Sequence, residues 1–282
     1  MTQRKPVRAG AKKQKPAKPS TAKAKANVKA KAKAKAKARP KKATAKRATA
    51  ANDTGSDVVQ EIIQRAFEAR DQGSFAVGAT LFEHAAVLSP SDWRLPNEAG
   101  VLYFRAEHYA DAVRCFDAAL RLRPGDLFVL FNKALAHSLA SDDDAALAVL
   151  RDVLAVDSTY GPAHFEIGKI YQRQDRLADA YACFATALAA NPSAPPPPRL
   201  VALALLNQAR IRFEQNRDAD ALAHVRALWD AVQDGPTIVK LARELSAAGQ
   251  HERARAVIDV LLAVDPGDAD AVAIARVYRQ NS

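Results

Sequence analysis

Residues 93–126 read W-R-L-P-N-E-A-G-V-L-Y-F-R-A-E-H-Y-A-D-A-V-R-C-F-D-A-A-L-R-L-R-P-G-D, and the pattern of this stretch returns every 34 residues. Four successive units share a proline, a small residue and a large residue at matching places: Pro90, Pro124 and Pro192, with Ser158 in the third unit; Gly78, Ala112, Ala146 and Ala180; and Phe82, Phe116, Leu150 and Phe184. Small residues let helix backbones approach each other, and large residues fill the gaps between them. The proline ends a helix because the residue before it resists the α region. The stretch therefore predicts helices packed in a repeating order.

A period of 34 residues with this pattern resembles the tetratricopeptide repeat. The family's signature offsets of 8, 11, 17, 20, 24, 27 and 32 are filled in residues 93–126 by Gly100, Tyr103, Tyr109, Ala112, Phe116, Ala119 and Pro124. Pro96 stands at offset 4, where the family usually has an aromatic residue. The resemblance implies an all-α solenoid of about six helix–turn–helix repeats, with a capping helix at its C-terminal end.

The repeat pattern divides the chain into four parts. We expect a Lys- and Ala-rich tail over residues 1–56, repeats one to four over 57–194, a proline-rich break over 195–201, and degenerate repeats five and six with the capping helix over 202–282. The first four repeats begin at residues 59, 93, 127 and 161, and the last two begin at 202 and 235. Four consecutive prolines, residues 195–198, predict a stiff polyproline segment instead of a helix.

The tail carries a charge opposite to that of the rest of the chain. Up to Ser56 the sequence has 19 of its 42 Lys and Arg residues and one of its 31 acidic residues, which leaves 23 basic and 30 acidic residues downstream. Few large apolar residues occur in the tail, so we expect disorder in isolation, with helix formation only on an anionic template. Its composition resembles the tails of linker histones and of bacterial histone-like proteins. The residues predicted to contact an anionic partner are Lys23, Lys25, Lys29, Lys31, Lys33, Lys35, Lys37, Arg39, Lys41 and Lys42.

Cysteine spacing and the lack of apolar segments favour a cytoplasmic protein. Cys115 and Cys183 stand two whole periods apart, and non-adjacent units of a solenoid do not touch, so we expect neither a disulfide nor a shared metal site. No apolar segment follows the charged N-terminus as an export signal would require. No run of about 18 apolar residues predicts a transmembrane helix. The tail leaves nucleoid association open as an alternative location.

We expect no catalytic residues, no metal site and no cofactor, and therefore not an enzyme. The sequence lacks the zinc-protease, nucleophile-elbow, phosphate-loop and dinucleotide-binding signatures. Its six histidines are scattered, and most of them fall on predicted helices. Asp142, Asp143 and Asp144 lack the glycine and terminal Glu of a calcium loop. Ser141 or one of these aspartates as an N-cap explains the acidic run better.

The resemblance also implies a binding groove. In the family, the first helix of each repeat lines the inner groove, mainly through offsets 2, 5, 9, 12 and 13. Carried over by position, the predicted groove residues are Ile63, Phe67 and Arg70; Arg94, Asn97, Val101, Phe104 and Arg105; Phe128, Phe131, Leu135 and Leu139; and Phe165, Lys169, Gln172 and Arg173. Phe131 and Leu135 fit groove and core about equally well. The carboxylate clamp of some family members is absent, because Ile63 and Phe67 stand at its Lys and Asn places.

Three classes of function compete at this stage. The first is a scaffold or chaperone that binds a protein segment in the groove, with a basic tail for anionic partners. The second is a nucleic-acid-associated protein whose tail neutralises phosphates, although an anionic membrane surface would also attract it. Chaperones of type III secretion translocators are similar in having such a groove and no catalytic domain. The third, an enzyme on a repeat platform, lacks room for a catalytic domain after residue 268.

Overall fold

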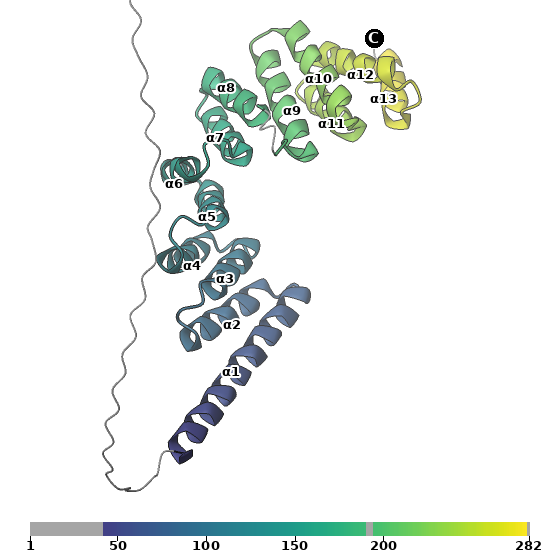
Figure 1. The fold of residues 1–282 in the computed structure, drawn as a ribbon. Helices are drawn as coiled ribbons and strands as arrows, with labels where there is room; N and C mark the ends of the chain where they lie inside the picture. The colour runs from purple at the N-terminus through teal and green to yellow at the C-terminus, as the bar shows by residue number, and fades with distance from the viewer. Residues whose placement is uncertain (1–41, 190–193, 281–282) are drawn as a thin grey trace, which may run out of the picture. The chain divides into compact units, whose positions relative to one another are not determined.

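The computed structural model describes residues 42–189 and 194–280. Their contacts place a boundary after Arg47, and the account below concerns the unit from Ala48 onward. In the described residues the regular elements are thirteen α-helices (Figure 1): α1 (Lys42–Asp71), α2 (Phe75–Leu88), α3 (Arg94–Arg105), α4 (Tyr109–Leu122), α5 (Leu127–Leu139), α6 (Asp143–Val156), α7 (Gly161–Arg173), α8 (Leu177–Leu188), α9 (Pro198–Glu214), α10 (Asp218–Val232), α11 (Gly235–Ala247), α12 (His251–Val264) and α13 (Ala269–Gln280). The predicted all-α repeat solenoid, with six helix pairs and a last single helix, is confirmed.

The turn inside each helix pair repeats at one place of the pattern. The fifteenth residue of every repeat has a positive φ, between 57° and 77°: Gly73, Glu107, Ser141, Asp175, Asn216 and Gly249. A left-handed residue reverses the chain sharply after the first helix, and the next helix then begins two residues later. All six units, including the two degenerate ones, therefore use the same connection.

A small-to-large contact holds the two helices of a repeat together. Gly100 of α3 lies so close to Phe116 of α4 that a Cβ on the glycine would stand 2.7 Å from Phe116 Cε1. Gly168 of α7 has the same relation to Phe184 of α8, also at 2.7 Å. Both phenylalanines are fully buried. The offsets 8 and 24 of the sequence pattern are therefore the two sides of one contact.

Polar contacts add to the packing between repeats one and two. Tyr103 Oη donates to Glu83 Oε2 at 2.7 Å, and Arg114 Nη1 donates to Glu83 Oε1 at 2.6 Å. Burial works to raise the pKa of Glu83, but the hydrogen bonds from Arg114 and Tyr103 outweigh it and hold that pKa below its ordinary value. Burial and the Glu83 carboxylate raise the pKa of the adjacent Cys115 thiol to about 12, so this thiol stays protonated.

Helices α1 and α9 begin near two of the predicted segment boundaries. α1 begins at Lys42, inside the segment for which we predict disorder; residues 1–41, with nine of the ten predicted anion contacts, lie outside the described residues. Pro197 has φ −63° and ψ 147°, which is polyproline geometry, but Pro198 already belongs to α9. Proline fits the first position of a helix, where its missing N–H has no partner to lose. The proposed boundaries at residues 56 and 201 stay predictions.

The acidic run at the start of α6 has a structural role in helix capping. Asp142 is the N-cap, and its carboxylate accepts a hydrogen bond from the Ala145 backbone N–H at 3.2 Å. Asp143 and Asp144 follow in the first turn, where the helix dipole favours negative charge. Of the two alternatives, an aspartate and not Ser141 therefore caps the helix.

Candidate partner-binding groove

The first helices of successive repeats form one row. α3 contacts α5, α5 contacts α7, α7 contacts α9, and α9 contacts α11, although each of these pairs is separated by a second helix in sequence. This row of first helices, α3 to α11, carries the predicted groove residues of repeats two to four. The row is therefore the surface to which these predicted groove residues belong.

The predicted groove residues of the first two repeats are largely engaged within the chain. Phe67 packs edge-to-face on Phe82 at 5.2 Å, and the Arg70 guanidinium lies 4.7 Å from the Phe67 ring. Arg105 stacks on Phe75 in the same way, at 4.2 Å. These contacts cover aromatic faces that would otherwise be open to a partner.

On α3, the remaining predictions divide between the helix end and the core. The Arg94 side chain pairs with Asp92 at 2.8 Å, beside the start of the helix. Val101 and Phe104 are half-buried against the core of the first two repeats. Asn97 is half-buried, and its Oδ1 has no hydrogen-bond partner among the described residues.

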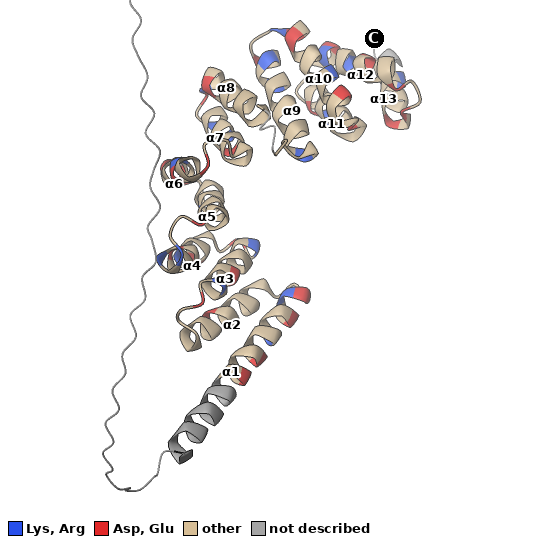
Figure 2. Ribbon diagram, in the orientation of Figure 1, with Lys and Arg blue, Asp and Glu red and all other residues tan. Residues whose placement is uncertain are grey.

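Helix α5 presents an exposed apolar stripe. Phe128 has 68% of its surface exposed and Leu139 has 51%, and the half-buried Leu135 lies between them on the same face at helical spacing. Phe131 points elsewhere, since it packs edge-to-face on Tyr160 at 5.3 Å. In Figure 2, α5 is almost without charged residues. Of the four predicted residues on this helix, Phe128, Leu135 and Leu139 therefore lie along the stripe, whereas Phe131 serves mainly the core.

A cavity of about 470 Å³ opens between α7 and α9. Four of its lining residues come from α7, namely Phe165, Lys169, Gln172 and Arg173, and three come from α9, namely Leu203, Asn207 and Arg210. Phe165 is buried and forms the apolar floor together with Leu203. The structure thus brings together the four predicted residues of repeat four and adds three residues of α9 that are not among our predictions.

The signal for the α9 residues was present in the sequence. Counted from residue 202, Leu203 and Arg210 stand at offsets 2 and 9 of repeat five, the same places that predict Phe128 and Lys169. Our groove prediction covers only the first four repeats, and the proline-rich segment shifts the spacing before repeat five. Asn207 stands at offset 6, outside the groove pattern, so no sequence signal marks it.

Neither a metal site nor a membrane span emerges from the described part of the chain. Its His, Cys, Asp and Glu residues form no group of three or more that could hold a metal ion. None of its helices combines the length and the apolar composition needed to cross a lipid bilayer.

Comparison with known proteins agrees with this geometry. Residues 97–161 and 165–236 match the model of a tetratricopeptide repeat family. The chain is a tetratricopeptide repeat protein. Repeats of this family generally serve as protein-interaction scaffolds. A curated relative, anaphase-promoting complex subunit 3 of Schizosaccharomyces pombe, is 30% identical over 92 residues, which are 33% of this chain. The match spans 14% of the length of that relative.

Solved structures of other tetratricopeptide repeat proteins share the fold. MamA residues 41 to the end, from Desulfovibrio magneticus, superpose with a TM-score of 0.53 at 18% identity, covering 64% of this chain and 97% of that one. Pseudomonas aeruginosa PilF superposes with a TM-score of 0.53 at 14% identity, covering 81% of this chain and 100% of that one. At such identities the likeness concerns the fold alone.

Proposed function

We propose that this tetratricopeptide repeat protein is a non-catalytic scaffold or chaperone that binds a segment of a partner protein along the row of first helices. The observation that carries the proposal is the apolar stripe of α5, in which Phe128 and Leu139 are exposed and Leu135 between them is half-buried. Exposed apolar side chains aligned on one helix face are typical of sites where a partner segment docks. The stripe borders α7, whose side chains line the cavity with α9.

The test is affinity capture with the full chain as bait. Phe128→Asp combined with Leu139→Asp should abolish capture of partner proteins while the helical circular dichroism spectrum stays unchanged, since both side chains are at least half exposed. Val87→Asp is the matched control, because Val87 is 77% exposed on α2, a second helix outside the row. Equal capture by the wild type and the double variant would refute the proposal.

The basic tail supports a second candidate role, attachment to nucleic acid. Nineteen basic residues and one acidic residue among the first 56 suit sequence-independent contact with phosphates. This role is compatible with partner binding in the groove, because it uses a different part of the chain. The location that we propose is the cytoplasm, with nucleoid association as the alternative if the tail binds nucleic acid. A role like that of type III secretion translocator chaperones is an alternative for the groove.

A further inference from the structure

The cavity between α7 and α9 has basic side chains at its rim and no acidic side chain in its lining. Lys169, Arg173 and Arg210 supply the positive charge, and the lining is completed by two amides and two apolar residues. The exposed fractions of the three basic side chains are 38%, 42% and 30%. A ligand in the cavity would therefore meet partly accessible cations from two successive repeats.

Contacts with residues on neighbouring helices and within α9 hold two of these cations in place. Arg173 reaches from α7 to Asp143 and donates through Nη2 to Ser138 Oγ at 3.1 Å. Arg210 pairs with Glu244 of α11, and its Nη1 donates to Asn207 Oδ1 at 3.3 Å. Side chains that are already ordered lose less entropy when a ligand binds.

Donors remain on all three cations after these contacts are made. The hydrogen bonds of Arg173 use Nε and Nη2, and those of Arg210 use Nη1 and Nη2. Lys169 uses one donor, in its 2.8 Å bond to Glu166. Arg173 Nη1, Arg210 Nε and two Lys169 hydrogens are thus available to an incoming acceptor.

We propose that this cavity selects the partner by binding an extended peptide segment in which an acidic side chain stands next to an apolar one. The carboxylate would accept from Arg173, Arg210 and Lys169, and the apolar side chain would rest on Phe165 and Leu203. The Gln172 and Asn207 amides are of the kind that hydrogen bond to a peptide backbone. This inference rests on the proposed function and gives its partner a chemistry. The apolar floor favours a peptide over a nucleic acid, whose phosphates would gain nothing from it.

The probe is a phage-displayed library of random twelve-residue peptides, selected on the immobilised full chain. Selected peptides should be enriched in Asp or Glu beside Leu, Ile, Phe or Val. Fluorescence anisotropy of a selected peptide should show about tenfold weaker binding to the neutral pair Lys169→Gln with Arg210→Gln, because charge-assisted hydrogen bonds are lost. The charge-reversed pair Arg173→Glu with Arg210→Glu should bind still more weakly.

The control for the charge-reversed pair is Arg226→Glu with Arg243→Glu. It changes the net charge by the same amount, but on α10 and α11 and outside the cavity lining. This control should bind as the wild type does, and circular dichroism should give all variants the wild-type helicity. Peptides without acidic residues, binding unaffected by the neutral pair, or failure to select any peptide would each overturn the inference. The inference would also be overturned if a single-stranded oligonucleotide displaced the selected peptide and the neutral pair weakened binding of that oligonucleotide.

The outcome separates this inference from the proposed function. If partner capture depends on Phe128 and Leu139 but selected peptides show no acidic preference, the scaffold proposal stands and the cavity proposal fails. If the Phe128 and Leu139 variant captures partners normally, the scaffold proposal itself fails.

Discussion

At the residue scale, the contact between Gly168 and Phe184 predicts a measurable cost for one methyl group. Gly168→Ala should lower the free energy of unfolding by about 1–2 kcal/mol, because the steric penalty of overpacking exceeds the gain of about 1 kcal/mol in helix propensity. Chemical denaturation measures this difference. Phe184→Leu shortens the opposing side chain, so Gly168→Ala should cost less in that background than in the wild type. Equal costs in both backgrounds would show that the ring does not set the limit.

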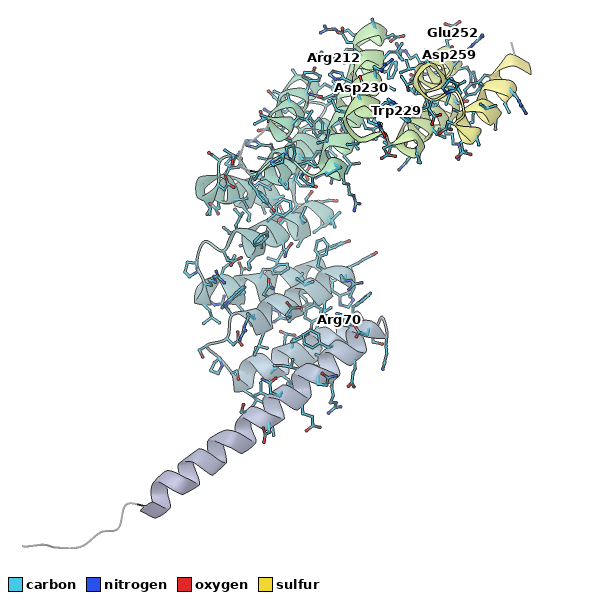
Figure 3. All side chains as sticks on the ribbon, turned by 45° about the vertical axis from the view of Figure 1, so that its right-hand side comes forward. Arg70, Arg212, Trp229, Asp230, Glu252 and Asp259 are labelled. Atoms are coloured by element: carbon cyan, nitrogen blue, oxygen red, sulfur yellow. The ribbon has the colours of Figure 1, made fainter. Side chains whose placement is uncertain are left out.

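His224 predicts a pH dependence of stability at the junction of repeats four and five. Its Nε2 lies 3.0 Å from Tyr181 Oη of α8, and the Arg212 guanidinium of α9 (labelled in Figure 3) lies 3.8 Å from the Tyr181 ring centroid. Burial and Arg212 lower the pKa of His224 below 6.5, against the opposing effect of Asp220 on its own helix. The folded protein therefore binds this proton less readily than the unfolded chain. The stability that the neutral His224 imidazole contributes is fully present above about pH 6.5 and is lost as the pH falls below it.

The measurement is thermal melting of the wild type and of His224→Gln between pH 5 and pH 7.5. The wild type should lose more stability than the variant on acidification, because glutamine cannot take up the proton. Carboxyl groups titrate in both proteins and cancel in the comparison. Parallel curves across this range would contradict the assignment.

At the element scale, the turn between the two helices of a repeat carries avoidable strain. Glu107 has φ 63°, whereas the equivalent residues Gly73 and Gly249 are glycines. The left-handed conformation costs a side-chain-bearing residue about 1–2 kcal/mol, and glycine loses about 0.5–1 kcal/mol more chain entropy on folding. Glu107→Gly should therefore raise the free energy of unfolding by roughly 0.5–1 kcal/mol. Urea denaturation tests this, with Glu107→Ala as a control that should bring no gain.

At the scale of the whole molecule, the separation of charge predicts a salt-dependent interaction. The full chain should bind double-stranded DNA at low salt and lose that binding steeply as salt rises, because neutralised phosphates release counterions. Removal of residues 1–41 should abolish the binding and leave α1 intact, since α1 begins at Lys42. Binding is measured by fluorescence anisotropy over a salt series. Equal binding by both forms would exclude the tail as the contact.

Much of the architecture could be predicted from particular residues. Gly100, Phe116 and Pro124 recur at one spacing, and each has a local reason: close approach, filling, and helix termination. Asp142 follows from helix capping in the same way. The groove could be predicted only as a set of positions, because the same offset gives a half-buried Phe131 in repeat three and a buried Phe165 in repeat four. The depth of a side chain depends on the neighbouring repeat, which an offset does not describe.

The repeat, its period and the helix pairs follow from the amino-acid sequence, because each depends on residues within one unit. The opposite charges of tail and body follow from composition. The stacking of the repeats, by contrast, places Arg105 over the Phe75 ring, leaves the α5 stripe open and brings Lys169, Arg173 and Arg210 around one cavity. Those outcomes depend on contacts between side chains 30 or more residues apart, such as Arg173 with Ser138 and Arg210 with Glu244. Their physical reason is the stacking of adjacent repeats, which sets the distances between helices that no single repeat specifies.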